Sequence, residues 1–177
     1  IKNESFCIGV SGGPDSLALA YLCKIYSEEF NIKYRVLIVN HGLRKESTAE
    51  AKEVKSILLR KRILSKILRW KGKIPKSNIQ LNARQIRYGL LLKECYFLNI
   101  KNLILGHQID DFVENFLIRL FRGSGLKGLT SFSQVSFLNN NNQKIIRPLI
   151  TIKKKDLIYI SKKIFGKYIL DPTNFNE

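Results

Sequence analysis

A short apolar segment that runs through a glycine-rich turn into a helix constrains the fold of this chain more than any other feature. Phe6–Val10 has the length and composition of a buried strand, and apolar residues continue at helical spacing after Pro14. Proline is favoured in the first helical turn, where its missing N–H group has no partner in any case. The sequence Ser-Gly-Gly-Pro-Asp-Ser at residues 11–16 therefore joins a strand directly to a helix.

This junction has the properties of an anion site. Gly12 and Gly13 allow close approach of a ligand to the backbone, and the new helix presents unpaired N–H groups and the positive end of its dipole. Asp15 repels an anion but suits a Mg²⁺ ion that bridges phosphates. We therefore predict a polyphosphate-binding loop with magnesium on Asp15. Its predicted contact residues are Ser11, Gly12, Gly13, Pro14, Asp15 and Ser16.

Two common nucleotide motifs do not explain the loop. The chain has no Gly-x-x-x-x-Gly-Lys-Ser/Thr sequence, which excludes the usual phosphate loop. Residues 123–128 match the dinucleotide fingerprint, but they follow a predicted helix instead of a strand, so we reject an NAD site. An ordinary glycine-rich turn at residues 11–16 remains the structural alternative. Without an NAD site, residues 123–128 are a basic loop able to close over substrate or touch RNA.

Strand and helix patterns alternate along the rest of the chain. This rhythm predicts one α/β domain over residues 1–177, with a doubly wound, mainly parallel sheet and ligands beyond the carboxyl ends of its strands. A small hairpin is expected near the C-terminal part, around the asparagine run at 139–142. Further strands are predicted at residues 34–40, 63–70, 102–105, 132–138 and 144–149. Helices are predicted at residues 48–61, 77–98 with Ser77 as cap, after 106, and 153–165.

Polar residues gather where the predicted strand 102–105 meets the next helix. His107, Asp111 and Glu114 have the spacing of one helix face, with Asp110 beside them. Carboxylates at a helix start can be simple caps, but this set together favours binding of Mg²⁺ or an ammonium group. Two histidines and no paired cysteines exclude a zinc set.

The apolar residues of that same helix are expected to face the core. They are Phe112, Val113, Phe116, Leu117, Leu120 and Phe121.

Arg84 and Arg87 lie three residues apart on the predicted helix 77–98, so both can face one side. Guanidinium groups suit phosphate or carboxylate ligands, although a solvated helix face is equally consistent.

Composition points to a polyanionic partner. The formal charge of +17 creates a strong attractive field for RNA, although a lysine- and asparagine-rich composition can also reflect nucleotide bias in the genome. Three widely spaced cysteines, Cys7, Cys23 and Cys95, are expected to be reduced core residues. No membrane-length apolar run or signal peptide is visible, which predicts a cytosolic location without membrane partners. Absence of methionine suggests a trimmed or partial product.

Ser-Gly-Gly-x-Asp-Ser resembles the pyrophosphate (PP) loop of the N-type ATP pyrophosphatases. With the other motifs in order, the chain resembles the N-terminal catalytic domain of the tRNA(Ile)-lysidine synthases over nearly its whole length. The matching segments are 11–16, 41–44, 83–88, 106–111 continuing through 119–129, 147–149 and 171–174. Departures from the family pattern are Gln80, Asn40 and Asn115, none of them a predicted catalytic group.

The resemblance implies ATP and Mg²⁺ as cofactors, and a CAU-anticodon isoleucine tRNA and free L-lysine as substrates. ATP would adenylate C2 of the wobble cytidine and lysine would displace AMP. It places Arg87, His107, Asp111 and Glu114 around the activated base and the lysine, with both carboxylates on its ammonium group. His41 is expected near the nucleotide. A tRNA-binding region downstream of residue 177 is expected, and a homodimer stays open.

Three alternatives remain from the sequence. A tRNA thiolase usually needs Cys-x-x-Cys pairs, which are missing here. A small-molecule amidating synthetase shares the first loop but not the segment after Arg119. A noncatalytic RNA-binding domain fits the charge, but it leaves Asp15, Asp111 and Glu114 without a use.

Overall fold

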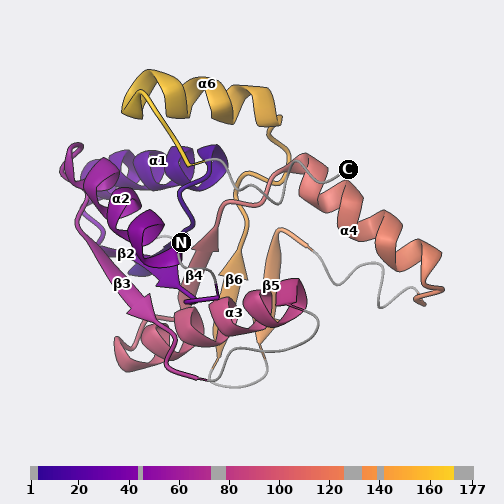
Figure 1. Cartoon of the computed structure of the whole chain (residues 1–177). Helices are drawn as coiled ribbons and strands as arrows, with labels where there is room; N and C mark the ends of the chain where they lie inside the picture. Colours follow the sequence, from indigo (N-terminus) through magenta and orange to yellow (C-terminus); the bar gives the residue numbers. More distant parts are fainter. Residues whose placement is uncertain (1–3, 44–45, 73–78, 126–132, 139–141, 170–177) are drawn as a thin grey trace.

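A six-stranded, mostly parallel sheet forms the centre of the molecule (Figure 1). The computed structural model describes residues 4–43, 46–72, 79–125, 133–138 and 142–169. The strand order is β3-β2-β1-β4-β6-β5, and only the β5–β6 pair is antiparallel. The predicted parallel sheet and small C-terminal hairpin are therefore confirmed. The strands are β1 (Phe6–Val10), β2 (Tyr34–Asn40), β3 (Ser65–Arg69), β4 (Asn102–Leu105), β5 (Val135–Leu138) and β6 (Gln143–Ile146).

Helices cover both faces of the sheet, as a doubly wound fold requires (Figure 1). On one face, buried residues of α1, α2 and α6, such as Leu17, Val54 and Leu157, form one core with β1 and β2. On the other face, Leu91 and Cys95 of α3 form a second core. The helices are α1 (Pro14–Phe30), α2 (Ser47–Leu59), α3 (Ile79–Phe97), α4 (Ile109–Phe121) and α6 (Lys154–Phe165).

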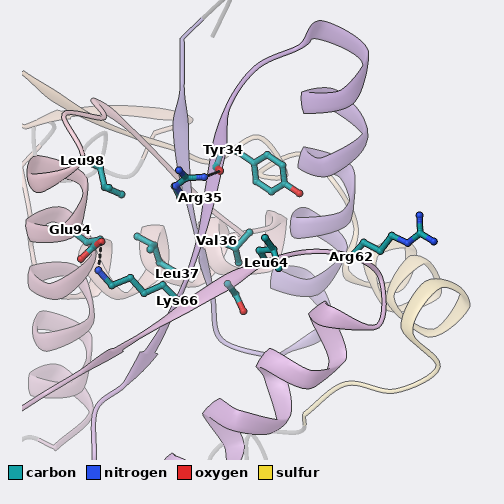
Figure 2. Close-up of a pocket in the computed structure, with 10 residues that line it drawn as sticks. Tyr34, Arg35, Val36, Leu37, Arg62, Leu64, Lys66, Glu94 and Leu98 are labelled. Atoms are coloured by element: carbon teal, nitrogen blue, oxygen red, sulfur yellow. Dashed lines mark hydrogen bonds and ion pairs between the residues drawn. The ribbon is translucent and has the colours of Figure 1, made fainter.

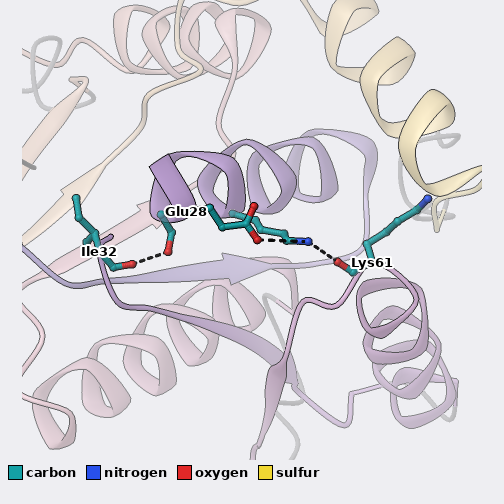
Figure 3. Close-up of polar contacts among 5 residues, drawn as sticks. Glu28, Ile32 and Lys61 are labelled. Carbon is teal, nitrogen blue, oxygen red and sulfur yellow. Dashed lines mark hydrogen bonds and ion pairs between the residues drawn. The ribbon is translucent and has the colours of Figure 1, made fainter. Parts of the chain in front are cut away.

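Polar contacts fix the C-terminal end of α1 (Figure 3). The chain leaves the helix through Asn31 in the left-handed conformation (φ 51°), and the Ser27 hydroxyl donates to the carbonyl of Ile32 at 2.5 Å. Lys24 lies 3.7 Å from Glu28 and donates to the carbonyl of Lys61 at 3.0 Å. The last contact ties the C-terminal half of α1 to the turn before β3.

The predicted inward face of α4 is wrong. Its apolar side chains are 36–49% exposed, and Phe121 is 84% exposed. The physical reason is that α4 extends away from the sheet beyond β4, so no layer of the domain lies over it among the described residues (Figure 1).

Other boundaries differ by one to a few residues. The predicted strand 63–70 is shorter at both ends, and the helix predicted at 48–61 begins at Ser47 and ends at Leu59. Ser77, the predicted cap of α3, lies outside the described residues. All three cysteines are buried and free, as predicted. Among the described helices, none combines the length and the hydropathy needed to cross a bilayer.

Candidate active site

The turn at residues 11–16 has the tight backbone that its glycines predict. Gly12 has a φ of 96°, and a Cβ atom there would lie 2.5 Å from Cγ2 of Val54. Gly13 is the N-cap of α1 and Pro14 is its first residue. Gly12 therefore meets both a conformational and a steric requirement that no other residue satisfies.

Ser16 has an unexpected position in this turn. It is buried, and its hydroxyl accepts hydrogen bonds from the backbone N–H groups of Ser11 (3.2 Å) and Gly12 (3.1 Å). The same hydroxyl donates to the Gly13 carbonyl at 3.0 Å. We expected Ser16 to offer its hydroxyl to a ligand. In the structure it shapes the turn instead, whereas Ser11 is exposed.

The turn lies beside the end of β4, where the chain order of the sheet changes direction. β1 pairs with β2 on one side and with β4 on the other, and Gly9 lies opposite Leu105. A Cβ atom at Gly106 would be 3.1 Å from the backbone nitrogen of Ser16. Ligands of open α/β sheets bind at such a switch point, so the turn and the start of α4 form one site.

The surroundings of Asp15 disfavour the charged form of its carboxyl group. Burial, followed by the nearby Asp111 and Asp110 carboxylates, raises its pKa to about 6, although Lys154 of α6 opposes the shift. Its Oδ1 atom is buried and finds no hydrogen-bond donor among the described residues. A buried carboxylate oxygen without a donor, repelled by two others, fits a divalent cation.

The start of α4 is organised by a capping box. Gln108 is buried, its Oε1 accepts from the Asp110 N–H, and its own N–H donates to Asp111 Oδ2, both at 2.9 Å. The simple capping role that we kept as an alternative thus holds for Asp111, one oxygen of which is used in this way. Sequence reasoning missed Gln108, because glutamine is not a favoured N-cap residue.

His107 faces three arginines. Burial lowers its pKa to about 3, and Arg147, Arg84 and Arg87 add to the effect in that order. The structure therefore brings both predicted α3 arginines to the end of β4 and keeps the imidazole neutral. Arg84 also lies over the ring of Tyr88, at 5.7 Å from its centroid.

Arg147, which follows β6, was given no role by sequence reasoning. It is buried, and its Nη1 donates to the Ser133 carbonyl and to Ser136 Oγ, both at 2.8 Å. Only the parallel pairing of β6 with β4 brings it to the site, and no local signal predicts that pairing.

Two other predicted residues, His41 and Glu114, lie at the periphery of the site. His41, at the end of β2, is half-buried, and its Nδ1 accepts from the Leu43 N–H at 3.2 Å. Glu114 is exposed, one turn along α4 from Asp110 and Asp111.

Within the described ranges, no three histidine, cysteine or acidic side chains converge on a common metal position.

The structure also contains an open groove of about 490 Å³ at the amino ends of the strands, whereas the candidate site lies at their carboxyl ends (Figure 2). It lies at the starts of β2 and β3, where Lys66 pairs with Glu94 of α3 at 2.7 Å. None of the predicted site residues lines it.

A parallel α/β sheet with a glycine-rich turn at its switch point defines a nucleotide-binding class of domain. The family model described as "PP-loop domain" matches residues 1–177, and the chain belongs to this family.

Curated relatives are tRNA(Ile)-lysidine synthases. The chain is 45% identical to that of Orientia tsutsugamushi over 98% of its length, 40% identical to that of Wolbachia pipientis over 97%, and 35% identical to that of Bradyrhizobium diazoefficiens over 94%. It covers only 38%, 40% and 46% of these relatives, respectively.

Two solved structures share the fold. The U34-tRNA thiolase NcsA from Methanococcus maripaludis, with its [4Fe-4S] cluster, has a TM-score of 0.81 at 24% identity, over 99% of this chain and 61% of that one. An NH3-dependent NAD synthetase from Campylobacter jejuni has a TM-score of 0.54 at 14% identity, over 97% and 71%.

Proposed function

We propose that residues 1–177 are the ATP-dependent catalytic domain of a tRNA(Ile)-lysidine synthase. ATP adenylates C2 of the wobble cytidine in a CAU-anticodon tRNA, pyrophosphate leaves, and the lysine side chain then displaces AMP. The single observation that carries the proposal is the junction of the PP-loop turn with the His107 to Asp111 segment at one switch point. The names of the curated relatives supply the particular reaction.

In the first step, residues 11–16 hold the pyrophosphate part of ATP. The first turn of α1 presents backbone N–H groups to the leaving phosphates, and Ser16 keeps the turn in shape through Gly12 and Ser11. Asp15 would hold Mg²⁺, which neutralises the charge that develops as the phosphate bond breaks. His41, at the end of the neighbouring strand, lies toward the nucleotide.

In the second step, residues around the start of α4 receive the lysine. Asp111 and Glu114 offer carboxylates to the ammonium group of the lysine. His107, whose pKa is lowered to about 3, lies beside them as a neutral imidazole that can form hydrogen bonds with the substrates. Arg87 adds positive charge beside His107, which suits the phosphate of the adenylated base. The two steps thus use the two sides of one switch point.

The substrates also bear on tRNA recognition and on location in the cell. Recognition of the whole tRNA is assigned to a region downstream of this domain, and the basic surface, formal charge +17, attracts the RNA. ATP, tRNA and free lysine meet in the cytoplasm, so we place the enzyme there.

A thiolase is the weaker candidate. All three cysteines are buried, and Cys23 packs in the core on one face of the sheet while Cys7 and Cys95 pack in the core on the other. An iron–sulfur cluster needs convergent thiolates, which this arrangement does not provide.

The test is mass spectrometry of nucleosides from a CAU-anticodon tRNA incubated with ATP, Mg²⁺, labelled lysine and the protein that carries this domain. Labelled lysidine is expected with the native sequence and with Asp156→Asn, an exposed carboxylate on α6. Asp15→Asn should reduce the product by a factor of at least about 100, because one electrostatic contact to the transition state is worth that much. Absence of lysidine, or full product with Asp15→Asn, contradicts the proposal.

A further inference from the structure

The phosphate-binding turn carries little positive charge of its own. Residues 11–23 contain no lysine, arginine or histidine, and Asp15 adds a negative charge. In the usual phosphate loop, a lysine of the loop itself reaches the β- and γ-phosphates. The backbone N–H groups of α1 and a magnesium ion on Asp15 would supply part of the missing charge, but the carboxylate cancels part of that of the metal. A cation from another element would complete the site.

Helix α6 begins at the same edge of the sheet as α1. The strands β1 and β6 are both parallel to β4, and α1 and α6 follow β1 and β6 in the chain. Both helices therefore start at the carboxyl ends of the strands. They pack side by side, with Leu157 of α6 and Leu17 of α1 buried in the same core (Figure 1). The start of α6 hence lies next to the phosphate-binding turn.

The segment before α6 is fixed to the candidate site. The N–H group of Ile109, at the start of α4, donates to the carbonyl of Ile152 at 3.4 Å. Two residues later, Lys154 is the first residue of α6, and it is exposed. Among the charged groups of the described residues, Lys154 is the cation that acts on Asp15, where it opposes the rise of the Asp15 pKa. Lys154 is therefore at the mouth of the site.

The dipole of α6 disfavours a lysine at this position. Positive side chains are unfavourable at the N-terminus of a helix, yet Lys154 and Lys155 directly follow the N-cap residue Lys153. Within the described part of the chain, the ammonium group of Lys154 makes no hydrogen bond or ion pair. Its charge is thus available to a ligand. The alternative is that Lys154 only offsets the negative charge of Asp15.

We propose that the ammonium group of Lys154 binds the β- and γ-phosphates of ATP at residues 11–16, as the lysine of the usual phosphate loop does. This inference rests on the proposed function, because it takes ATP to be the ligand. Lysine suits the role, since its flexible stem carries a compact charge that can follow the phosphates as pyrophosphate leaves. Arg84 and Arg87 belong to α3, which covers the opposite face of the sheet, and they serve the His107 side of the site.

Calorimetric titration of the protein that carries this domain tests the contact with two nucleotides. A non-hydrolysable ATP analogue with Mg²⁺, and AMP, are titrated into the native protein and its variants. Lys154→Met should weaken binding of the analogue by a factor of about 10–100, as expected for a lost charge-assisted hydrogen bond. AMP should bind as before, because it lacks the β- and γ-phosphates.

Two further variants serve as controls. Lys155→Met removes the same charge from the next residue of α6, which is also exposed, and it should leave both affinities unchanged. Lys154→Arg keeps a positive charge at the site and should retain most of the affinity for the analogue. Circular dichroism checks that each variant is folded.

A titration with EDTA in place of Mg²⁺ separates direct contact from an effect through Asp15. If Lys154 touches the phosphates, Lys154→Met should weaken binding of the analogue without the metal as well. A loss that is seen with Mg²⁺ but vanishes with EDTA would mean that Lys154 acts on the metal site, and would overturn the proposed contact.

Equal affinity of the native protein and Lys154→Met for the analogue also overturns the proposal. An equal loss in Lys155→Met overturns it too, because any lysine at the start of α6 would then have the same effect. Failure of the native protein to bind the analogue would contradict both this inference and the proposed function. Binding with the predicted loss in Lys154→Met, but without formation of lysidine, would support the contact and contradict only the proposed reaction.

Discussion

A Cβ atom on Gly106 would lie 3.1 Å from the backbone nitrogen of Ser16, so the end of β4 packs directly against the first turn of α1. This contact joins the two halves of the site, since Asp15 precedes Ser16 and His107 follows Gly106. A side chain between them would separate the phosphate-binding turn from the start of α4.

Gly106→Ala should therefore destabilise the domain by about 1–3 kcal/mol, because the backbone at Ser16 cannot move without disturbing the turn. The measurement is urea unfolding. Gly89→Ala is the control, since nothing lies within 4 Å of its added Cβ atom and the residue is in helix α3. It should gain up to about 1 kcal/mol from better helix propensity. Equal effects of the two changes would contradict the close packing at Gly106.

Two buried serines offer a second matched comparison. Ser16→Ala removes the acceptor for the N–H groups of Ser11 and Gly12, which should cost about 1–3 kcal/mol and weaken ATP binding. Ser161→Ala removes a buried hydroxyl that has no partner among the described residues, so its free energy of unfolding should change little or rise. Calorimetric titration with ATP and urea unfolding measure both effects. A neutral Ser16→Ala would show that the hydroxyl does not organise the turn.

Asp15 should make stability fall as pH rises. Its pKa is raised to about 6 in the folded chain from 3.8, so between these values the folded state holds a proton that the unfolded state has lost. The free energy of unfolding should decrease over this range, and Asp15→Asn should remove that decrease. At pH 7, added Mg²⁺ should raise the melting temperature of the native chain more than that of Asp15→Asn. The same Mg²⁺ response in both proteins would argue against the magnesium role.

His107 should have the opposite pH dependence. The pKa of His107 is lowered to about 3 from 6.5, so between these pH values the unfolded state binds a proton that the folded state does not bind. Stability contributed by the neutral imidazole is therefore lost as pH falls from about 6.5 towards 3, and His107→Gln should remove this loss.

NMR titration of the His107 ring measures its protonation directly. We expect the ring to stay neutral down to at least pH 5. Arg147→Met should raise the pKa of His107, because Arg147 is the largest of the charges acting on it. Titration of His107 near pH 6.5 in the native chain would contradict the burial of its ring among arginines.

The sheet was predictable because its signals are local. The apolar runs at 6–10, 34–40 and 102–105 are strands with those bounds, and the glycine-rich turn lies between β1 and α1 as expected. Apolar periodicity shows that a helix has an apolar face but not what covers it, which is why α4 was placed wrongly. The inward hydroxyl of Ser16 and the approach of Arg147 to His107 depend on backbone geometry and strand pairing, and no local pattern encodes these.

The central claim, that residues 11–16 bind the phosphates of ATP, is tested most directly by NMR. Backbone amide shifts of the isotope-labelled chain are followed during titration with a non-hydrolysable ATP analogue and Mg²⁺. The largest changes should occur at Ser11, Gly12, Gly13 and Asp15, with smaller ones at Gly106 and His107. Changes centred on the groove at Arg35 and Lys66, with residues 11–16 unaffected, would contradict the account.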